Sequence, residues 1–246
     1  MRTLTLGHWS FAPGLIPSLV GLVLIVLFAR LGVWQLQRAD EVRTRQAAIA
    51  AQGQLPPIDL NRTAAAGDDL GPLLWRPATA HGAWDAQRQV LLDNQTVDGR
   101  VGYFVFTPLR LDACACALMV NRGWIDAGPD RSTLPEIRVA STAAALRGIL
   151  APLPPAGIGV RPDVERLPNS DALRVQRLDF DTLPTAPGVR LLPLILQLAP
   201  EASDGYRRTW HRPDLRADRH VAYAVQWFIF ALLTAGLYLR LNLKRL

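Results

Sequence analysis

Two long apolar runs, one near each end of the chain, constrain this sequence more than any other feature. Residues 14–29 read GLIPSLVGLVLIVLFA without a charge, and residues 221–239 read VAYAVQWFIFALLTAGLYL, also without one. A helix that crosses a bilayer needs about 20 apolar residues. The second run meets that length, and the first meets it once its uncharged flanks are included. We therefore predict a membrane protein with two spanning helices, over 13–36 and 220–239.

Each run has an alternative interpretation. The first, preceded by Arg2, has the form of a cleaved signal peptide, but the small-x-small sequence of residues 48–50 lies well beyond the run and behind several charges. The second has the length of a buried core helix. Such a helix seldom runs so long without a charged face, and Arg240, Lys244 and Arg245 follow the run as they would at lipid headgroups. Uncleaved membrane anchors are the favoured interpretation of both runs.

Two spans place both chain ends, 1–12 and 240–246, on one side of the membrane and residues 37–219 on the other. Arginines flank the spans on both sides, and more of them lie on the side of the middle segment. A simple count therefore favours a cytoplasmic middle segment, but the rule is weak for segments longer than about 60 residues. The residues alone leave the orientation open.

The middle segment has the pattern of a small β-rich domain. The first apolar run continues as a polar helical stretch over 38–54, which Gly53, Pro56 and Pro57 end. Short apolar stretches separated by turn residues follow, which is typical of strands. They cover 75–84, 89–93, 102–111, 117–125, 137–150 and 189–198. We predict a mostly antiparallel small barrel or sandwich with one or two short helices, a turn at Asp98-Gly99, and Pro108 at an edge or a bulge.

The net charge of +6, from 27 Lys and Arg against 21 Asp and Glu, raises the question of nucleic-acid binding. The basic residues other than Lys244 are arginines, and they form no run of five and no stripe interleaved with aromatics. The sequence fingerprints of dinucleotide, P-loop, zinc-protease and hydrolase sites are absent as well. We expect no nucleic-acid partner and no enzymatic activity.

Cys114 and Cys116 are the chain's two thiols. In an extended strand their Cα atoms would lie about 6.6 Å apart, near the upper limit for a disulfide, and a tight turn would bring them closer. Incidental thiols, a disulfide and a copper site all stay open. Incidental thiols are favoured, because no Met or His lies nearby in the sequence to complete a copper site.

His220 opens the second span, where an imidazole at the headgroup boundary is partly dehydrated yet still reaches water. At 100° per residue, Tyr223 and Trp227 fall on the same helix face as His220. An aromatic belt with a polar cap, which is common at membrane interfaces, is the plainer interpretation of this face.

The first span ends with a comparable face, formed by Trp34 and Arg38 together with Leu31 and Gln35. If the two helices pack together, both faces lie at one level of the membrane. An imidazole, aromatic rings and a guanidinium would then converge on an apolar ligand with an anionic edge. Haem has that shape and polarity, because histidine can ligate its iron and arginine can pair with its propionates.

Five segments, in this order, resemble the surfeit locus protein one family of cytochrome c oxidase assembly factors. They are LGVWQLQR (31–38), QVLLDNQTVDGRVGY (89–103), MVNRGWI (119–125), GPDR (128–131) and RHVAYAVQWF (219–228). The resemblance covers nearly the whole chain, and the Cys114/Cys116 pair and the Arg/Ala-rich stretches depart from it. Turn-forming and packing roles explain the following residues of these segments equally well: Asp93, Asn94, Gly99, Arg100, Asn121, Arg122, Gly123 and Trp124.

The resemblance implies a multi-pass protein of the bacterial inner membrane, with cytoplasmic ends and the domain of residues 37–219 in the periplasm. It implies a role in maturing the catalytic subunit I of the oxidase, by receiving haem a or assisting its insertion. Subunit I, the haem a synthesis enzymes and membrane lipid are the expected partners. The family's haem-ligating histidine falls on His220, and we expect Tyr223, Trp227 and Trp34 to line the site and Arg38 to lie near a propionate.

Two alternatives stay open. The protein would be a scaffold for subunit I that binds no haem, with another factor delivering the cofactor. Less favoured is a membrane-anchored periplasmic enzyme that uses His81, Asp93 or Asp98, because no nucleophile and base stand at a recognisable spacing.

Overall fold

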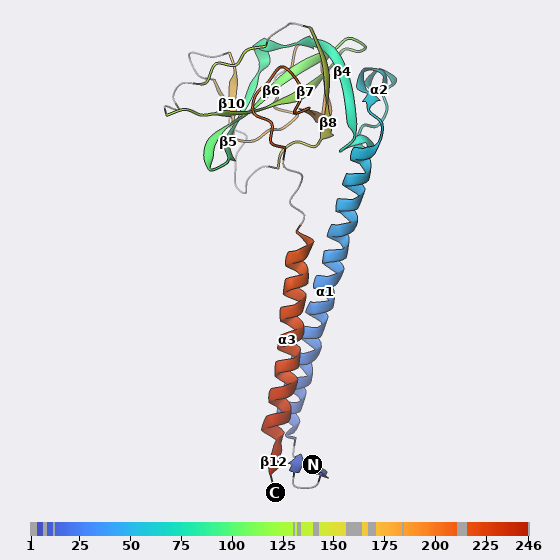
Figure 1. Ribbon diagram of the computed structural model, residues 1–246, viewed down its shortest axis with the longest axis vertical. Helices are drawn as coiled ribbons and strands as arrows, with labels where there is room; N and C mark the ends of the chain where they lie inside the picture. The colour runs from blue at the N-terminus through green and yellow to red at the C-terminus, as the bar shows by residue number, and fades with distance from the viewer. Residues whose placement is uncertain are drawn as a thin grey trace. The chain divides into compact units, whose positions relative to one another are not determined.

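The computed structural model describes residues 4–6, 9–11, 13–129, 131, 134–139, 143–155, 164–166, 171–183, 185–210 and 216–245. Half of the predicted tail 1–12 and Asp130 of the GPDR segment lie outside this part of the chain. The chain forms two compact units, Met1–Ala48 with Pro213–Leu246, and Ile49–Arg212. The first unit holds two long apolar helices and the second holds a β-rich domain (Figure 1).

Helix α1 runs without interruption over Leu15–Gln54. The apolar and polar stretches predicted for this region are therefore one helix of 40 residues. It begins after Pro13 and ends before Pro56 and Pro57, as expected from residues that lack an N–H and disfavour helix in the residue before them. Helix α3 spans Ala217–Asn242. Both helices are long and apolar enough to cross a membrane, and their apolar stretches are mostly exposed.

The chain ends are paired rather than simple tails. Strands β1 (Leu4–Leu6), β2 (Trp9–Phe11) and β12 (Leu243–Arg245) form a small antiparallel sheet with β2 in the middle. Leu243, directly after α3, pairs with Phe11, shortly before α1. This pairing ties the N-terminal end of α1 to the C-terminal end of α3.

The second unit consists of short strands and turns of helix. Its elements are β3 (Ile58–Asp59), α2 (Leu60–Ala66), η1 (Gly71–Leu73), β4 (Pro77–Trp84), η2 (Ala86–Arg88), β5 (Val90–Val97), β6 (Arg100–Leu111), β7 (Cys116–Asp126), β8 (Ala143–Ala151), β9 (Val164–Arg166), β10 (Leu173–Val175) and β11 (Arg190–Leu198). The predicted turn lies between β5 and β6, where Asp98 and Gly99 both have positive φ.

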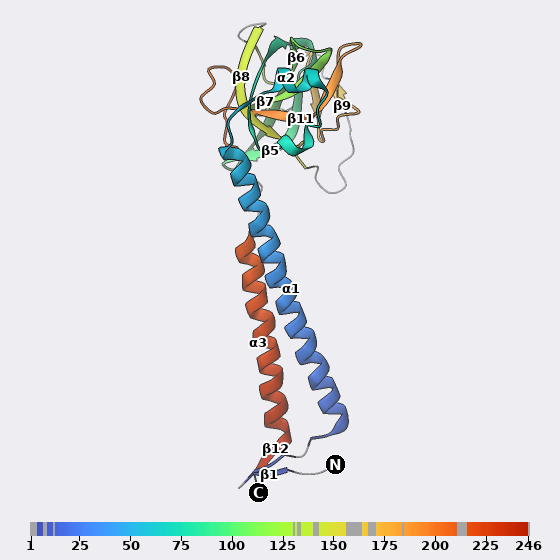
Figure 2. The ribbon, with the colours of Figure 1, turned by 90° about the vertical axis from the view of Figure 1, so that its right-hand side faces the viewer.

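Five of these strands close into a barrel, in the order β4, β8, β11, β7, β6 and back to β4 (Figures 1 and 2). Neighbours around the barrel are antiparallel except β7 and β11, which run parallel. Numbered along the chain, this is the strand connectivity of OB-fold barrels. Strands β5, β10 and β9 extend the sheet beyond β6, and β3 extends it beyond β4. The predicted β-rich domain is present, with a sheet that is mixed because β3–β4 and β5–β10 are also parallel.

Leucines fill the barrel. Alternate residues of β11 are at most 1% exposed, namely Leu192, Leu194, Leu196 and Leu198. They pack with residues of β7 and β8 such as Leu118, Val120 and Leu150 in one buried cluster. The opposite faces of the same strands belong to a second cluster with β5 and β10. Burial on both faces explains why these strands read as nearly continuous apolar runs.

Pro108 lies inside the central strand β6, contrary to the expected edge or bulge. Pairing of β6 with β5 ends at Phe106, and pairing with β4 begins at Leu109. On that side the Pro108 carbonyl accepts a hydrogen bond from the Asp85 N–H at 2.9 Å. The N and carbonyl of a residue in an antiparallel strand face the same side. The missing N–H of proline therefore falls in the gap between the two pairings and removes no ladder bond.

The strand predicted over 137–150 is too long. Strand β8 begins only at Ala143, and the carbonyls of Ile137 and Arg138 accept hydrogen bonds from the side chains of Gln89 and Arg122. These carbonyls are bound by side chains rather than by a neighbouring strand, so residues 134–139 remain irregular.

Candidate functional site between the two apolar helices

Helices α1 and α3 lie side by side in both views (Figures 1 and 2). Gly32 of α1 packs against Phe228 of α3, and a Cβ on Gly32 would lie only 2.7 Å from Cε1 of that ring. Gly21 packs in a similar way against Tyr238, whose Cδ2 would lie 3.2 Å from such a Cβ. Glycines let two membrane helices approach closely. The contact between the helices, which the sequence left undecided, is therefore direct.

Polar contacts between described residues also join the same helices. His220, in the first turn of α3, has its Nδ1 2.8 Å from Oε1 of Gln35 of α1. Near the other end of the pair, the hydroxyls of Ser18 and Tyr238 are 2.6 Å apart. The imidazole of His220 is half-buried and, within the described part of the chain, makes no second hydrogen bond. His220 and the polar face of the first span thus lie at the same height along the helix pair, and Gln35 is the residue of that face that contacts His220.

The other predicted site residues lie less close to this contact. Trp227 is half-buried and stacks on Phe28 of α1, with ring centroids 5.8 Å apart. Tyr223 and Trp34 are 51% and 54% exposed. Arg38 forms an exposed ion pair with Glu41 at 2.7 Å. The structure brings His220 and Trp227 to the interface with α1, and among the described residues no hydrogen bond or ring contact joins Tyr223, Trp34 or Arg38 to His220.

The residues considered for an enzymatic site are dispersed. Each forms a separate ion pair: His81 with Asp112, Asp93 with Arg131, and Asp98 with Arg207. In the described ranges, no group of three or more His, Cys, Asp and Glu side chains is placed to hold a metal ion. A haem site with one axial histidine would not form such a group.

Cys114 and Cys116 form a disulfide at the turn between β6 and β7, with Cα atoms 5.2 Å apart. The turn brings the two Cα atoms closer than an extended strand would. The favoured interpretation of these cysteines as incidental thiols was therefore wrong, and the disulfide alternative, with a turn that brings the two residues together, is the one present.

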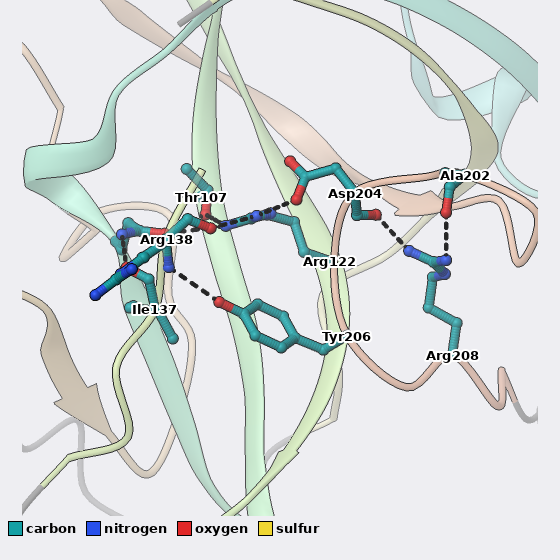
Figure 3. A network of polar contacts seen from close by, with 9 residues as sticks. Thr107, Arg122, Ile137, Arg138, Ala202, Asp204, Tyr206 and Arg208 are labelled. Atoms are coloured by element: carbon teal, nitrogen blue, oxygen red, sulfur yellow. Dashed lines mark hydrogen bonds and ion pairs between the residues drawn. The ribbon is translucent and has the colours of Figure 1, made fainter. Parts of the chain in front are cut away.

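Arg122, in the MVNRGWI segment, is a buried polar centre, and the sequence assigned it no more than a turn or packing role (Figure 3). Its side chain is 1% exposed, and its Nη2 donates to Oδ1 of Asp204 at 2.7 Å and to the Arg138 carbonyl at 2.6 Å. The guanidinium also lies over the rings of Trp84 and Tyr206, 5.4 and 5.3 Å from their centroids. A buried charge is tolerated only when it is paired and hydrogen-bonded in this way.

The packing role expected for the 119–125 segment is present, on a strand rather than in a turn. Arg122 follows Leu118 and Val120 at the alternate positions of β7 that face the barrel. Its guanidinium lies over Trp84, a member of the same buried cluster, and carries a paired charge there. The signal that could have found it is a charged residue at an inward-facing position of an otherwise apolar strand.

Comparison with known proteins adds a family. The sequence profile of the SURF1 family matches residues 22–232. Surfeit locus protein 1 of Arabidopsis thaliana is 31% identical over 104 residues, which are 39% of this chain and 29% of the plant protein. An uncharacterised SURF1-like protein of Mycobacterium bovis is 25% identical over 226 residues, covering 88% of this chain and 80% of the relative. A SURF1-like protein of Mycobacterium tuberculosis matches to the same extent.

Proposed function

The chain belongs to the SURF1 family, which is associated with cytochrome c oxidase assembly, and from that premise we propose that it assists the insertion of haem a into subunit I of the oxidase. In this proposal His220 holds the haem transiently at the membrane surface. The partners are subunit I, the enzymes that supply haem a, and membrane lipid. The β-rich domain lies in the periplasm of a bacterial inner membrane, and both chain ends lie in the cytoplasm.

The observation that carries the proposal is the half-buried imidazole of His220 between two apolar helices, engaged by Gln35 through one ring nitrogen only. A histidine that ligates iron uses one nitrogen for the metal and commonly donates the other N–H to an oxygen of the protein. The donor set around His220 is compatible with that arrangement.

The neighbouring side chains fit the rest of a haem. The stacked rings of Trp227 and Phe28, with the half-exposed rings of Tyr223 and Trp34, offer apolar surface for a macrocycle. The Arg38 guanidinium is exposed, and its ion pair with Glu41 contributes only about 0–1 kcal/mol. Exchange of Glu41 for a haem propionate would therefore cost little. When bound, the haem is the protein's cargo and supplies the iron and the two propionates that these residues recognise.

Membrane placement is supported by the surfaces of both helices. Four large apolar side chains along them, Leu15, Ile16, Leu232 and Leu241, are at least 70% exposed, and Leu19, Leu22 and Leu233 are 60–63% exposed. Contiguous exposed apolar surface of this kind marks contact with lipid or with another protein. In this proposal, lipid covers most of the surface, and subunit I covers the part near His220.

An optical spectrum of the detergent-purified full chain tests the proposal. The protein is expressed with and without the haem a synthesis enzymes, as wild type, His220→Ala and His81→Ala. The last variant is a matched control, because His81 is an exposed histidine that pairs with Asp112 in the β-rich unit. We expect a Soret band that depends on haem a supply, is lost with His220→Ala and is retained with His81→Ala.

Two outcomes would contradict parts of the proposal. Equal haem in wild type and His220→Ala would remove His220 as the ligand. No Soret band in any folded sample, together with reduced oxidase activity in a deletion strain, would favour the scaffold alternative, in which the bond from His220 to Gln35 only holds the helices together.

A further inference from the structure

We infer that Gln35 is a positioning residue for His220: its amide oxygen accepts the Nδ1 proton, fixes the neutral imidazole as the Nδ1–H tautomer, and leaves the lone pair on Nε2. The assignment of Nε2 as the iron-binding nitrogen rests on the proposed function. The assignment of the tautomer does not rest on the proposed function, because it follows from the contact between the two side chains.

The chemistry of the two groups decides the proton's place. An amide oxygen only accepts hydrogen bonds, and a neutral imidazole carries one N–H. Nδ1 of His220 and Oε1 of Gln35 are 2.8 Å apart, which is within the normal range of an N–H···O bond. The proton therefore lies on Nδ1. Nε2 is the remaining nitrogen, and within the described residues it has no hydrogen-bond partner.

Tight helix packing holds the two residues in place. Gly32, almost one turn before Gln35, lets α3 approach α1, and Ala224, one turn after His220, is fully buried. Both ends of the hydrogen bond thus belong to helical segments whose separation is fixed by small residues. Gln35 and His220 are both half-buried, so water competes only partly for the bond.

The neutral amide also suits a protein that must release its cargo. Partners of a ligating histidine set its orientation and raise its basicity, and loss of such a partner typically costs about 10- to 100-fold in metal affinity. A carboxylate in place of Gln35 would draw the Nδ1 proton more strongly and make Nε2 a better donor to iron. An amide orients the ring but strengthens the bond from Nε2 to iron less, so the haem can still be released.

The tautomer can be measured without haem. The full chain is labelled with ¹⁵N-histidine in detergent micelles, and its four histidines give few enough signals for His220 to be assigned by its absence in His220→Ala. We expect Nδ1 to be protonated in wild type and the proton to move toward Nε2 in Gln35→Leu. Gln35→Glu, which keeps an acceptor, should retain the Nδ1 proton. A wild-type ring protonated on Nε2 would overturn the inference, because the Gln35 amide would then be a donor to Nδ1.

Haem titration tests the functional side. We expect Gln35→Leu to lower haem affinity about 10- to 100-fold and to change the visible and EPR spectra of the bound haem, and Gln35→Glu to bind more tightly with a lower midpoint potential. Tyr238→Phe is the matched control, because it removes the other interhelical hydrogen bond, to Ser18, without touching His220. It should bind haem as wild type does.

The outcomes separate the two proposals. If Gln35→Leu and Tyr238→Phe weaken haem binding equally, the loss comes from helix pairing and the positioning role of Gln35 is overturned. If His220→Ala binds haem as wild type does, the proposed function fails, and the ¹⁵N spectrum still decides whether Gln35 fixes the tautomer. If only His220→Ala loses haem, the proposed ligand stands and Gln35 has no positioning role.

Discussion

The ring of Phe228 on α3 occupies the space that the absent side chain of Gly32 leaves open on α1. Three carbons of that ring would lie within 3.0 Å of a Cβ at position 32, so no larger residue fits there unless the ring moves. The contact sits just before Gln35 in α1. The close approach of the two helices near His220 therefore depends on the absence of a side chain at Gly32.

Gly32→Leu should separate the helices and destabilise their pairing by about 1–3 kcal/mol, the usual cost of overpacking. The measurement is the thermal unfolding midpoint of the full chain in detergent. Gly236→Leu in α3 is the control, because among the described residues a Cβ at Gly236 meets no atom within 4 Å beyond its own stretch of helix. An equal loss in both variants would contradict a specific packing role for Gly32.

Arg122→Ala should destabilise the β-rich unit by about 3–5 kcal/mol, because it leaves Asp204 and the Arg138 carbonyl without their buried donor. Urea unfolding of the full chain, followed by tryptophan fluorescence, measures the loss. Arg100→Ala removes an ion pair with Asp126 in which the Arg100 side chain is 70% exposed, and should cost at most about 1 kcal/mol. Similar losses in the two variants would mean that the Arg122 network contributes little.

Arg38→Ala should weaken haem binding by at most about fivefold and should lower the free energy of unfolding by at most about 1 kcal/mol. An exposed ion pair contributes about 0–1 kcal/mol, whether its anion is Glu41 or a propionate, and displacement of Glu41 offsets part of the gain from the propionate. Haem titration and thermal unfolding of the same samples separate the two effects. Arg43→Ala is the control, an exposed arginine further along the same helix. Equal weakening by both variants would indicate a general effect of charge.

Reduction of the Cys114–Cys116 disulfide should lower the free energy of unfolding by only about 1–2 kcal/mol. The two cysteines are two positions apart in the sequence, so the bond closes a very short loop and restricts the unfolded chain only slightly. Unfolding midpoints with and without reductant measure this, and alkylation followed by mass spectrometry verifies the redox state. A larger loss would show that the reduced thiol of Cys116, which is 2% exposed, no longer packs in the barrel.

The elements that local pattern controls were predictable. The long uncharged runs became α1 and α3, and the turn at Asp98-Gly99 lies between β5 and β6 as expected. The sequence left the choice between a barrel and a sandwich open, since nothing in β4 or β6 indicates that Gly82 pairs with Leu111 and so closes the sheet. Such pairings depend on the twist of the whole sheet rather than on local residue order.

For the candidate site, helical periodicity identified the right level of the helix pair but not the contacts. A stripe at i, i+3, i+4 and i+7 includes Trp34, Gln35 and Arg38, and of these Gln35 is the one hydrogen-bonded to His220 among the described residues. Which member of a stripe meets a neighbouring helix depends on the crossing geometry, which here follows from the small residues Gly32 and Ala224. Periodicity alone does not contain that information.

The spacing of these two polar contacts along the helix pair also bears on the bilayer thickness that would suit it. Ser18 and Gln35 are 17 residues apart in α1, which corresponds to about 26 Å along the helix. Lipid hydrocarbon is about 30 Å thick, so the two hydrogen bonds would lie close to its two boundaries in the proposed membrane placement. Sliding one helix by a turn would break both bonds at once and carry their polar groups toward hydrocarbon. Hydrophobic mismatch should therefore act directly on His220: a thicker membrane would draw the imidazole away from water, and a thinner one would expose it.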